Sequence, residues 1–207
     1  MPEMALKMAQ IENRLGISST YYFRKTPEVF NPKVIGMVAD LGHEVGYHYE
    51  VLDKASGDHC KAIKIFNSEL DDFRRICSVD TICMHGNPTS KWLNRDIWLF
   101  YTLFDYKLIG EAYLSLDFNR IHYISDTGRS WNSEARVKDY VSGTSNSAFK
   151  SIKKTPNLIK ILNKKIIRQV CINVHPQRWS DEMSPWIREL IGQNIKNIGK
   201  ICLKAIR

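Results

Sequence analysis

The first 84 residues alternate between two kinds of hydrophobic spacing, and this alternation constrains the fold more than any other feature of the chain. Apolar residues recur every three or four positions over 3–15 and 62–76, as on one face of an amphipathic helix. β-branched and aromatic residues cluster over 17–23 and 44–48, which is typical of strands. Helices that alternate with strands favour right-handed βαβ units around a parallel sheet, so we predict an α/β fold.

The segment between those two strands has helix signals at both ends. Asn31 is a favoured N-cap residue, Pro32 suits the first helical position, and Gly42 suits the end of the helix. In the strand that follows, the period of two places His48 on the same side as Glu44 and opposite to Tyr47.

The same spacing rules predict the remaining elements. In chain order they are a strand over 79–84, a helix over 95–104, short strands over 107–109 and 121–124, a polar loop over 142–147, a short basic helix from Thr155, a buried strand over 169–174 and a closing helix over 185–203. A chain of 207 residues is long enough for one substantial core and short for two ordinary domains. We therefore expect a single domain over 1–207.

The formal charge of +8 is concentrated in the last third of the chain. From Asn146 onward there are 13 Lys and Arg residues against three acidic residues. Such a stretch can bind nucleic acid or anionic lipid, or it can form a solvated surface. No nucleic-acid motif or aromatic ladder accompanies it, so we favour the surface and expect no specific nucleic-acid partner.

Five cysteines are scattered without a C-x-x-C pair, at Cys60, Cys77, Cys83, Cys171 and Cys202. This pattern is typical of reduced thiols rather than of a disulfide framework. The N-terminus lacks the apolar core of a signal peptide, and no apolar run reaches the length of a membrane span. We expect a cytoplasmic protein without a membrane span.

Three histidines directly follow short apolar runs, where a buried strand is expected to end. They are His48, His85 and His175. In α/β sheets and barrels, ligands bind beyond the carboxyl ends of the strands, where the loops converge. We therefore treat these three histidines as candidate functional residues.

Residues 42–48, Gly-His-Glu-Val-Gly-Tyr-His, resemble the second motif of the polysaccharide deacetylases, the NodB-like carbohydrate esterase family 4. The segment Ile172-Asn173-Val174-His175 resembles the last motif of that family, and the element order agrees over almost the whole chain. The resemblance implies a distorted (β/α) barrel and metal-assisted removal of N- or O-acetyl groups from a carbohydrate. It implies that His48 is a ligand of a divalent metal and that His175 is the general acid. Neutral imidazole ligands suit zinc, so we expect the metal to be zinc.

The sequence departs from the family pattern at three places. Leu52 occupies the position of the second histidine ligand, and Met84-His85-Gly86 replaces an Arg-Pro-Pro-Tyr motif, so His85 is the candidate for the missing imidazole. The family's first strand carries an Asp pair and precedes the first helix, whereas this chain begins inside that helix. We expect an N-terminally truncated barrel whose open edges allow self-association. The alternative is a non-catalytic remnant or a polyanion-binding interaction module.

Two turns supply candidate substrate-binding residues. These are Asp126, Arg129 and Trp131 in one turn, and Arg178 and Trp179 in the other. Tryptophan can stack on sugar rings, arginine can bind anionic groups, and Asp126 can orient His175. The alternative is ordinary turn chemistry.

The roles of His43, in the second motif, and of Glu50, just after it, are considered next. Glu50 is either a replacement carboxylate for the metal or a solvated loop residue. For His43 we prefer a structural role, because it lies in a turn where it can bond nearby backbone.

Overall fold

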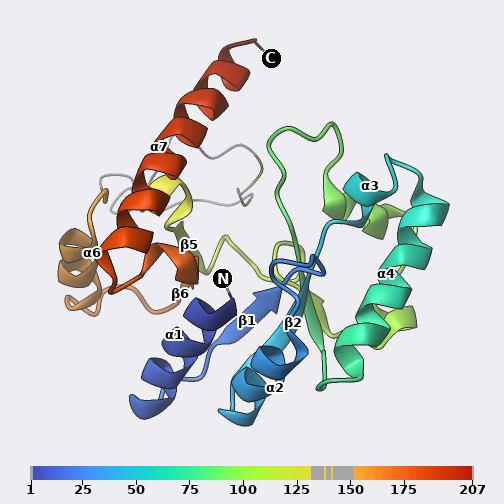
Figure 1. The fold of residues 1–207 in the computed structure, drawn as a ribbon, viewed down its shortest axis with the longest axis horizontal. Helices are drawn as coiled ribbons and strands as arrows, with labels where there is room; N and C mark the ends of the chain where they lie inside the picture. The colour runs from blue at the N-terminus through green and yellow to red at the C-terminus, as the bar shows by residue number, and fades with distance from the viewer. Residues whose placement is uncertain (1, 132–137, 139–140, 142–151, 207) are drawn as a thin grey trace. The chain divides into compact units, whose positions relative to one another are not determined.

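A computed structural model describes residues 2–131, 138, 141 and 152–206 of the chain (Figure 1). It contains two compact units, residues 1–115 and 116–207, which we call the N-terminal unit and the C-terminal unit. Both units contain parallel strands, which confirms the predicted α/β class. The described strands form one four-stranded and one two-stranded sheet, so the predicted barrel is not confirmed. The single domain stays a prediction, and the polar loop over 142–147 lies outside the described residues.

The N-terminal unit is built on a parallel sheet with the strand order β1-β2-β3-β4. Its strands are β1 (Thr20–Phe23), β2 (Glu44–Tyr49), β3 (Thr81–Met84) and β4 (Gly110–Glu111). Its helices are α1 (Pro2–Arg14), α2 (Pro32–Asp40), α3 (Val51–Lys54) and α4 (His59–Arg74). Helices α1 and α2 lie side by side (Figure 1).

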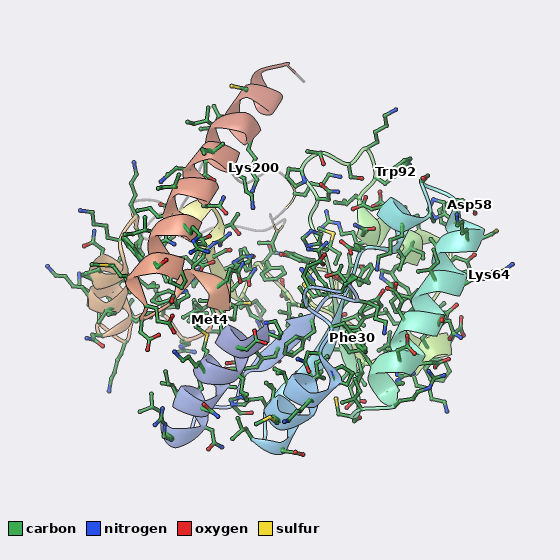
Figure 2. All side chains as sticks on the ribbon, viewed as in Figure 1. Met4, Phe30, Asp58, Lys64, Trp92 and Lys200 are labelled. Atoms are coloured by element: carbon green, nitrogen blue, oxygen red, sulfur yellow. The ribbon has the colours of Figure 1, made fainter. Side chains whose placement is uncertain are left out.

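The helix ends follow the signals in the sequence. The side chain of Asn31 accepts a hydrogen bond from the Val34 amide at 3.2 Å, and Gly42 has a φ of 83° just beyond the C-cap of α2. At the start of α4, Asp58 accepts from the Lys61 amide at 2.9 Å, while Lys64 projects outward (Figure 2). Both predicted helices are confirmed, within a few residues at each end.

The strand register sorts the sheet of the N-terminal unit into an apolar face and a polar face. On the apolar face, the Tyr47 ring lies 5.4 Å from that of Phe66 and 5.2 Å from that of Phe73, both on α4. On the same face, Tyr21 contacts the buried His43 ring, whose Nε2 lies 2.9 Å from the Ala9 carbonyl oxygen of α1. Helices α1 and α4 therefore pack against the same face of the sheet. The structural role of His43 is confirmed.

The opposite face of this sheet is polar. Thr81 donates a hydrogen bond to Glu44, and its hydroxyl lies 3.0 Å from that of Tyr22. His48 pairs in register with Cys83, which places both on this face, as the period of two predicts for His48. The polar face ends at the residues considered below as a metal site.

The predicted helix over 95–104 is wrong, because the segment forms two 3₁₀ turns, η1 (Asn94–Leu99) and η2 (Phe104–Tyr106). The buried Asn94 side chain accepts hydrogen bonds from the amides of Leu52 and Asp53 and donates to the His85 carbonyl oxygen. These tertiary bonds fix the segment at its start. The strand predicted over 107–109 is displaced to β4, because Lys107 adopts a left-handed φ of 54°.

The C-terminal unit has a small parallel sheet of β5 (His122–Ser125) and β6 (Val170–Asn173). Its other elements are η3 (Thr127–Arg129), α6 (Thr155–Leu162), η4 (Pro176–Arg178) and α7 (Met183–Ile206). Its buried cluster consists of Ile124, Trp131, Ile152 and Leu158. The prediction that β6 is buried is wrong, since Ile172 is 41% exposed in this two-stranded sheet. Among the residues that the structure describes, no helix combines the length and the apolar character needed to cross a bilayer.

Candidate functional site

Two of the three candidate histidines lie together at the carboxyl ends of β2 and β3. The Nδ1 atom of His85 lies 3.3 Å from the Nε2 atom of His48, and the two rings are nearly perpendicular, with centroids 5.1 Å apart. The His85 amide donates to the Tyr49 carbonyl oxygen at 2.7 Å, which extends the β2–β3 pairing by one residue. The parallel sheet therefore brings together imidazoles that are 37 positions apart in sequence.

The His48 ring is held by a backbone group. Its Nδ1 atom lies 2.9 Å from the Cys83 carbonyl oxygen, so this nitrogen carries the proton and Nε2, which faces His85 Nδ1, is the acceptor nitrogen of the ring. A ligating histidine is usually fixed in this way by its other ring nitrogen. Leu52, at the position where the family has its second histidine, is buried in the core.

The two imidazoles provide only part of a zinc coordination set. Zinc sites commonly use three or four protein donors. Within the described part of the chain, no three His, Cys, Asp or Glu side chains are grouped closely enough to hold a metal. His48 and His85 are of a residue type that ligates zinc, but among the described residues no third such side chain joins them.

Glu50 is neither solvated nor directed at the histidine pair. Its carboxylate forms an ion pair with Arg24 at 2.6 Å and lies 3.6 Å from the Lys54 ammonium nitrogen. Lys54 in turn binds Glu69, which accepts a hydrogen bond from the Tyr47 hydroxyl. Glu50 thus belongs to an ion-pair network, which corrects both roles considered for it from the sequence.

The third candidate histidine lies in the C-terminal unit and is paired with Asp126. Asp126 follows β5 and His175 follows β6, so both residues lie at the carboxyl end of the same small sheet. The Nδ1 atom of His175 lies 2.6 Å from Asp126 Oδ1, and the His175 amide donates to Oδ2 at 3.1 Å. The Asp126 side chain is 7% exposed and that of His175 is 34% exposed. The imidazole is therefore held by a buried carboxylate while part of its ring stays accessible.

Hydrogen-bond counting assigns the proton on the His175 ring. Arg178 Nη1 lies 2.8 Å from His175 Nδ1, but it also donates to Asp126 Oδ1 at 2.7 Å and to the Asp126 carbonyl oxygen at 2.8 Å. These two bonds use both hydrogens of Nη1. The hydrogen between His175 and Asp126 therefore belongs to Nδ1, which leaves Nε2 as the ring nitrogen that can accept a further proton.

The Asp126 carboxylate is ionised at neutral pH. Burial alone raises its pKa, but the hydrogen bond and charge of His175, together with the charge of Arg178, outweigh burial and hold the pKa below its ordinary value. The indole Nε1 of Trp179 adds a hydrogen bond to Oδ2 at 2.9 Å. Asp126 is thus a fixed anion that accepts bonds on both oxygens.

A cavity of about 330 Å³ lies within the C-terminal unit, and Asp126, the partner of His175, is one of the residues that line it. All five predicted substrate-binding residues line it: Asp126, Arg129, Trp131, Arg178 and Trp179. The indole rings of Trp131 and Trp179 are 6.0 Å apart at an angle of 49°, and Trp131 Nε1 donates to the Thr155 hydroxyl at 3.0 Å. The fold therefore gathers residues from two turns that are about 50 positions apart in sequence.

Helix α7 supplies residues of this site that the sequence did not single out. Glu189 forms ion pairs with both Arg129 and Arg178, and Arg129 lies 4.9 Å from the Trp186 ring centroid. In the sequence, Glu189 is one charged position in an amphipathic helix. Only its proximity to the two arginines, which the fold creates, distinguishes it.

Comparison with protein-family models, with curated proteins and with solved structures found no match to this chain. The resemblance to polysaccharide deacetylases therefore rests on the motif residues themselves and stays a prediction.

Proposed function

We propose that this chain is a hydrolase that removes N- or O-acetyl groups from a carbohydrate, with His175 as the proton donor to the leaving group. The observation that supports this proposal most directly is the hydrogen bond between His175 Nδ1 and the buried Asp126 carboxylate. A carboxylate that fixes one ring nitrogen orients the imidazole and stabilises its protonated form, as acid–base catalysis requires.

The surroundings of the pair suit a sugar substrate. The accessible part of His175 and the tryptophans of the cavity belong to the same unit, and Asp126 bonds to His175 and to Trp179 alike. Indole rings provide the flat apolar surface on which sugar rings pack. We propose that the cavity holds a sugar unit while His175 Nε2 delivers a proton to the departing amine or alcohol.

We propose zinc as the metal that His48 and His85 bind. Neutral imidazoles are common zinc ligands, and zinc, when bound, polarises a carbonyl group and lowers the pKa of a coordinated water. His48 contributes Nε2, since its Nδ1 is bonded to the Cys83 carbonyl oxygen. Zinc content and zinc affinity of the 207-residue chain, compared with His48→Ala and His85→Ala, test this assignment. Equal zinc affinity in the wild type and both variants would contradict it.

The hydrolase proposal is tested by acetate release from an N-acetylated chito-oligosaccharide and from an O-acetylated xylo-oligosaccharide. His175→Gln should lower the rate by about a hundredfold or more, because general acid catalysis contributes about that much. His59→Gln is the matched control, because its ring contacts Phe100 in the N-terminal unit and lies outside the His175–Asp126 pair. A wild-type chain that releases no acetate with zinc present would refute the proposal.

Binding of polyanions is a second candidate function. The observation that favours it is a group of exposed cations within and after α6, formed by Lys160, Lys164, Lys165 and Arg168. Polyanion binding of this kind weakens steeply with salt, because it releases counterions. A chain that is not retained on heparin at low ionic strength would exclude this function.

A further inference from the structure

Among the described residues, positive side chains outnumber negative ones around the cavity of the C-terminal unit. Asp126 is the acidic residue that lines it, and its oxygens already accept bonds from His175, Arg178 and Trp179. Arg178 forms ion pairs with two anions of its own unit, Asp126 and Glu189. Its charge is compensated without a ligand.

Arg129 is compensated in a similar way. It forms an ion pair with Glu189, and its guanidinium group lies over the Trp186 ring. The side chain of Arg129 is only 13% exposed, so its position is set by protein contacts. Neither arginine needs an added anion for charge balance.

Lys153 and Lys154 complete the lining and differ from both arginines. They immediately precede α6, are exposed and have no acidic partner among the residues that the structure describes. Two ammonium groups beside a cavity raise its potential and attract anions. Among the residues that the structure describes, they give this cavity a positive charge that its lining acid, Asp126, does not neutralise.

The aromatic part of the cavity indicates what carries the anion. Trp179 is 44% exposed, and its Nε1 hydrogen bond to Asp126 fixes the orientation of its ring. The ring of Trp131 contacts it at a tilt of 49°, so the two indoles do not form parallel plates between which a nucleobase stacks. A single exposed indole suits the apolar face of a sugar ring.

We propose that this cavity binds a saccharide that bears an anionic substituent, with the sugar ring on Trp179 and the carboxylate or phosphate group at Lys153 and Lys154. That the ligand is a sugar rests on the proposed function, and that the sugar carries a negative charge is the new inference. A volume of about 330 Å³ is near the lower limit for small-molecule pockets, which favours one or two sugar units.

The test is isothermal titration calorimetry of the full chain with matched neutral and anionic ligands. N-acetylglucosamine is compared with its 6-phosphate, and a chitin tetrasaccharide is compared with a hyaluronan tetrasaccharide, which carries carboxylates. Inorganic phosphate and polyuridylate are included to detect binding of phosphate or of RNA alone. We expect one of the anionic sugars to bind about tenfold more tightly than its neutral counterpart, as one charge-assisted contact allows. The anion that gives this preference identifies the substituent.

The double variant Lys153→Gln/Lys154→Gln should abolish this preference while changing the affinity for the neutral sugar less than twofold. The matched control is Lys160→Gln/Lys164→Gln, which removes two exposed cations that do not line the cavity and should keep the preference. Equal affinity for neutral and anionic sugars would overturn the inference, and acetate release from the neutral substrate would then still support the proposed function. An equal loss in both double variants, or tighter binding of polyuridylate than of any sugar, would also overturn it.

Discussion

Glu111 in the N-terminal unit and Asp126 in the C-terminal unit are both buried carboxylates, but their pKa values shift in opposite directions. Glu111 in the N-terminal unit is completely buried, and the Asp126 side chain in the C-terminal unit is 7% exposed. Burial raises the pKa of Glu111 above its ordinary value, whereas neighbouring charge lowers that of Asp126. Similar burial therefore gives opposite shifts in pKa.

The partners of the two carboxylates explain the difference. Those of Glu111 are neutral donors, namely the amides of Met84, Tyr113 and Leu114 and the hydroxyl of Tyr49. Asp126 has the guanidinium group of Arg178 and the imidazole of His175. Neutral donors satisfy hydrogen bonds but compensate little of the cost of burying a charge. We infer that Glu111 joins β3 to β4, while Asp126 is an anion held ready to orient His175.

Removal of Glu111 should have the largest effect on stability. Glu111→Ala leaves buried amide groups at Met84, Tyr113 and Leu114 without their acceptor, and each buried donor left unsatisfied costs about 1–3 kcal/mol. We expect the free energy of unfolding to fall by about 4 kcal/mol in urea denaturation. Asp71→Ala, at an exposed position on α4, should change it by less than about 0.5 kcal/mol. Equal small losses in both variants would show that Glu111 does not join the strands.

Asp126→Asn should be somewhat less destabilising but more damaging to activity. Asparagine keeps the size of the side chain but removes the charge that faces Arg178, and breaking a buried ion pair costs about 3 kcal/mol. The rate of acetate release should fall as well, because His175 loses the carboxylate that orients its ring. Asp117→Asn, at an exposed position of the same unit, is the control. Unchanged acetate release in Asp126→Asn would separate the pair from catalysis.

The sequence contained the elements of these sites but not their assembly. Periodicity and capping residues located α2, β2 and α4, because local backbone preferences and one buried face decide such elements. The motif residues Asp126 and His175 were singled out, and their contact follows from the pairing of β5 with β6. Glu111 was missed, because nothing local marks a carboxylate whose donors come from other strands and turns.

The segment after β3 shows why part of the fold was mispredicted. The sequence over 95–104, which is rich in Trp and Phe, predicts a helix, but Asn94 bonds to the amides at the start of α3, and Trp98 Nε1 donates to the Tyr49 hydroxyl at 2.9 Å. Such tertiary hydrogen bonds override local propensity. A single sequence does not reveal them, because their partners lie more than 40 positions away.

Because the pKa values of Asp126 and Glu111 shift in opposite directions, their contributions to stability should depend on pH in opposite ways. This provides a third test of the difference between the two carboxylates. The ionised Asp126 contributes stability above its unfolded pKa of about 3.9, and this contribution is lost as pH falls through the lower pKa of the folded state. The stability difference between wild type and Asp126→Asn should therefore shrink below about pH 4, by at most about 1.4 kcal/mol per pH unit.

Glu111 should behave in the reverse sense. Its pKa is raised in the folded state, so the folded protein binds the proton more tightly and gains stability as pH falls through that pKa towards the unfolded value of about 4.3. Relative to Glu111→Gln, wild type should become more stable over this interval. Urea denaturation at half-unit steps from pH 3 to pH 7 measures both differences. Slopes of the same sign would show that the two carboxylates do not differ as described.

The smallest effect is expected for Arg178→Lys, which tests whether Arg178 acts through its charge or through the geometry of its hydrogen bonds. Arg178→Lys keeps a positive charge near Asp126, but an ammonium group lacks the planar guanidinium, whose Nη1 bonds to Asp126 while its Nε lies 3.5 Å from Glu189. We expect a loss of about 1 kcal/mol in unfolding free energy, as for one net hydrogen bond. Because the charge remains, the low pKa of Asp126 should largely persist, so the acid-side slope of stability should stay close to that of wild type. Arg178→Gln should flatten that slope, because it removes a cation that favours the ionised carboxylate. If lysine and glutamine gave the same slope, the anionic state of Asp126 would depend on His175 alone, and Arg178 would act only through the geometry of its hydrogen bonds.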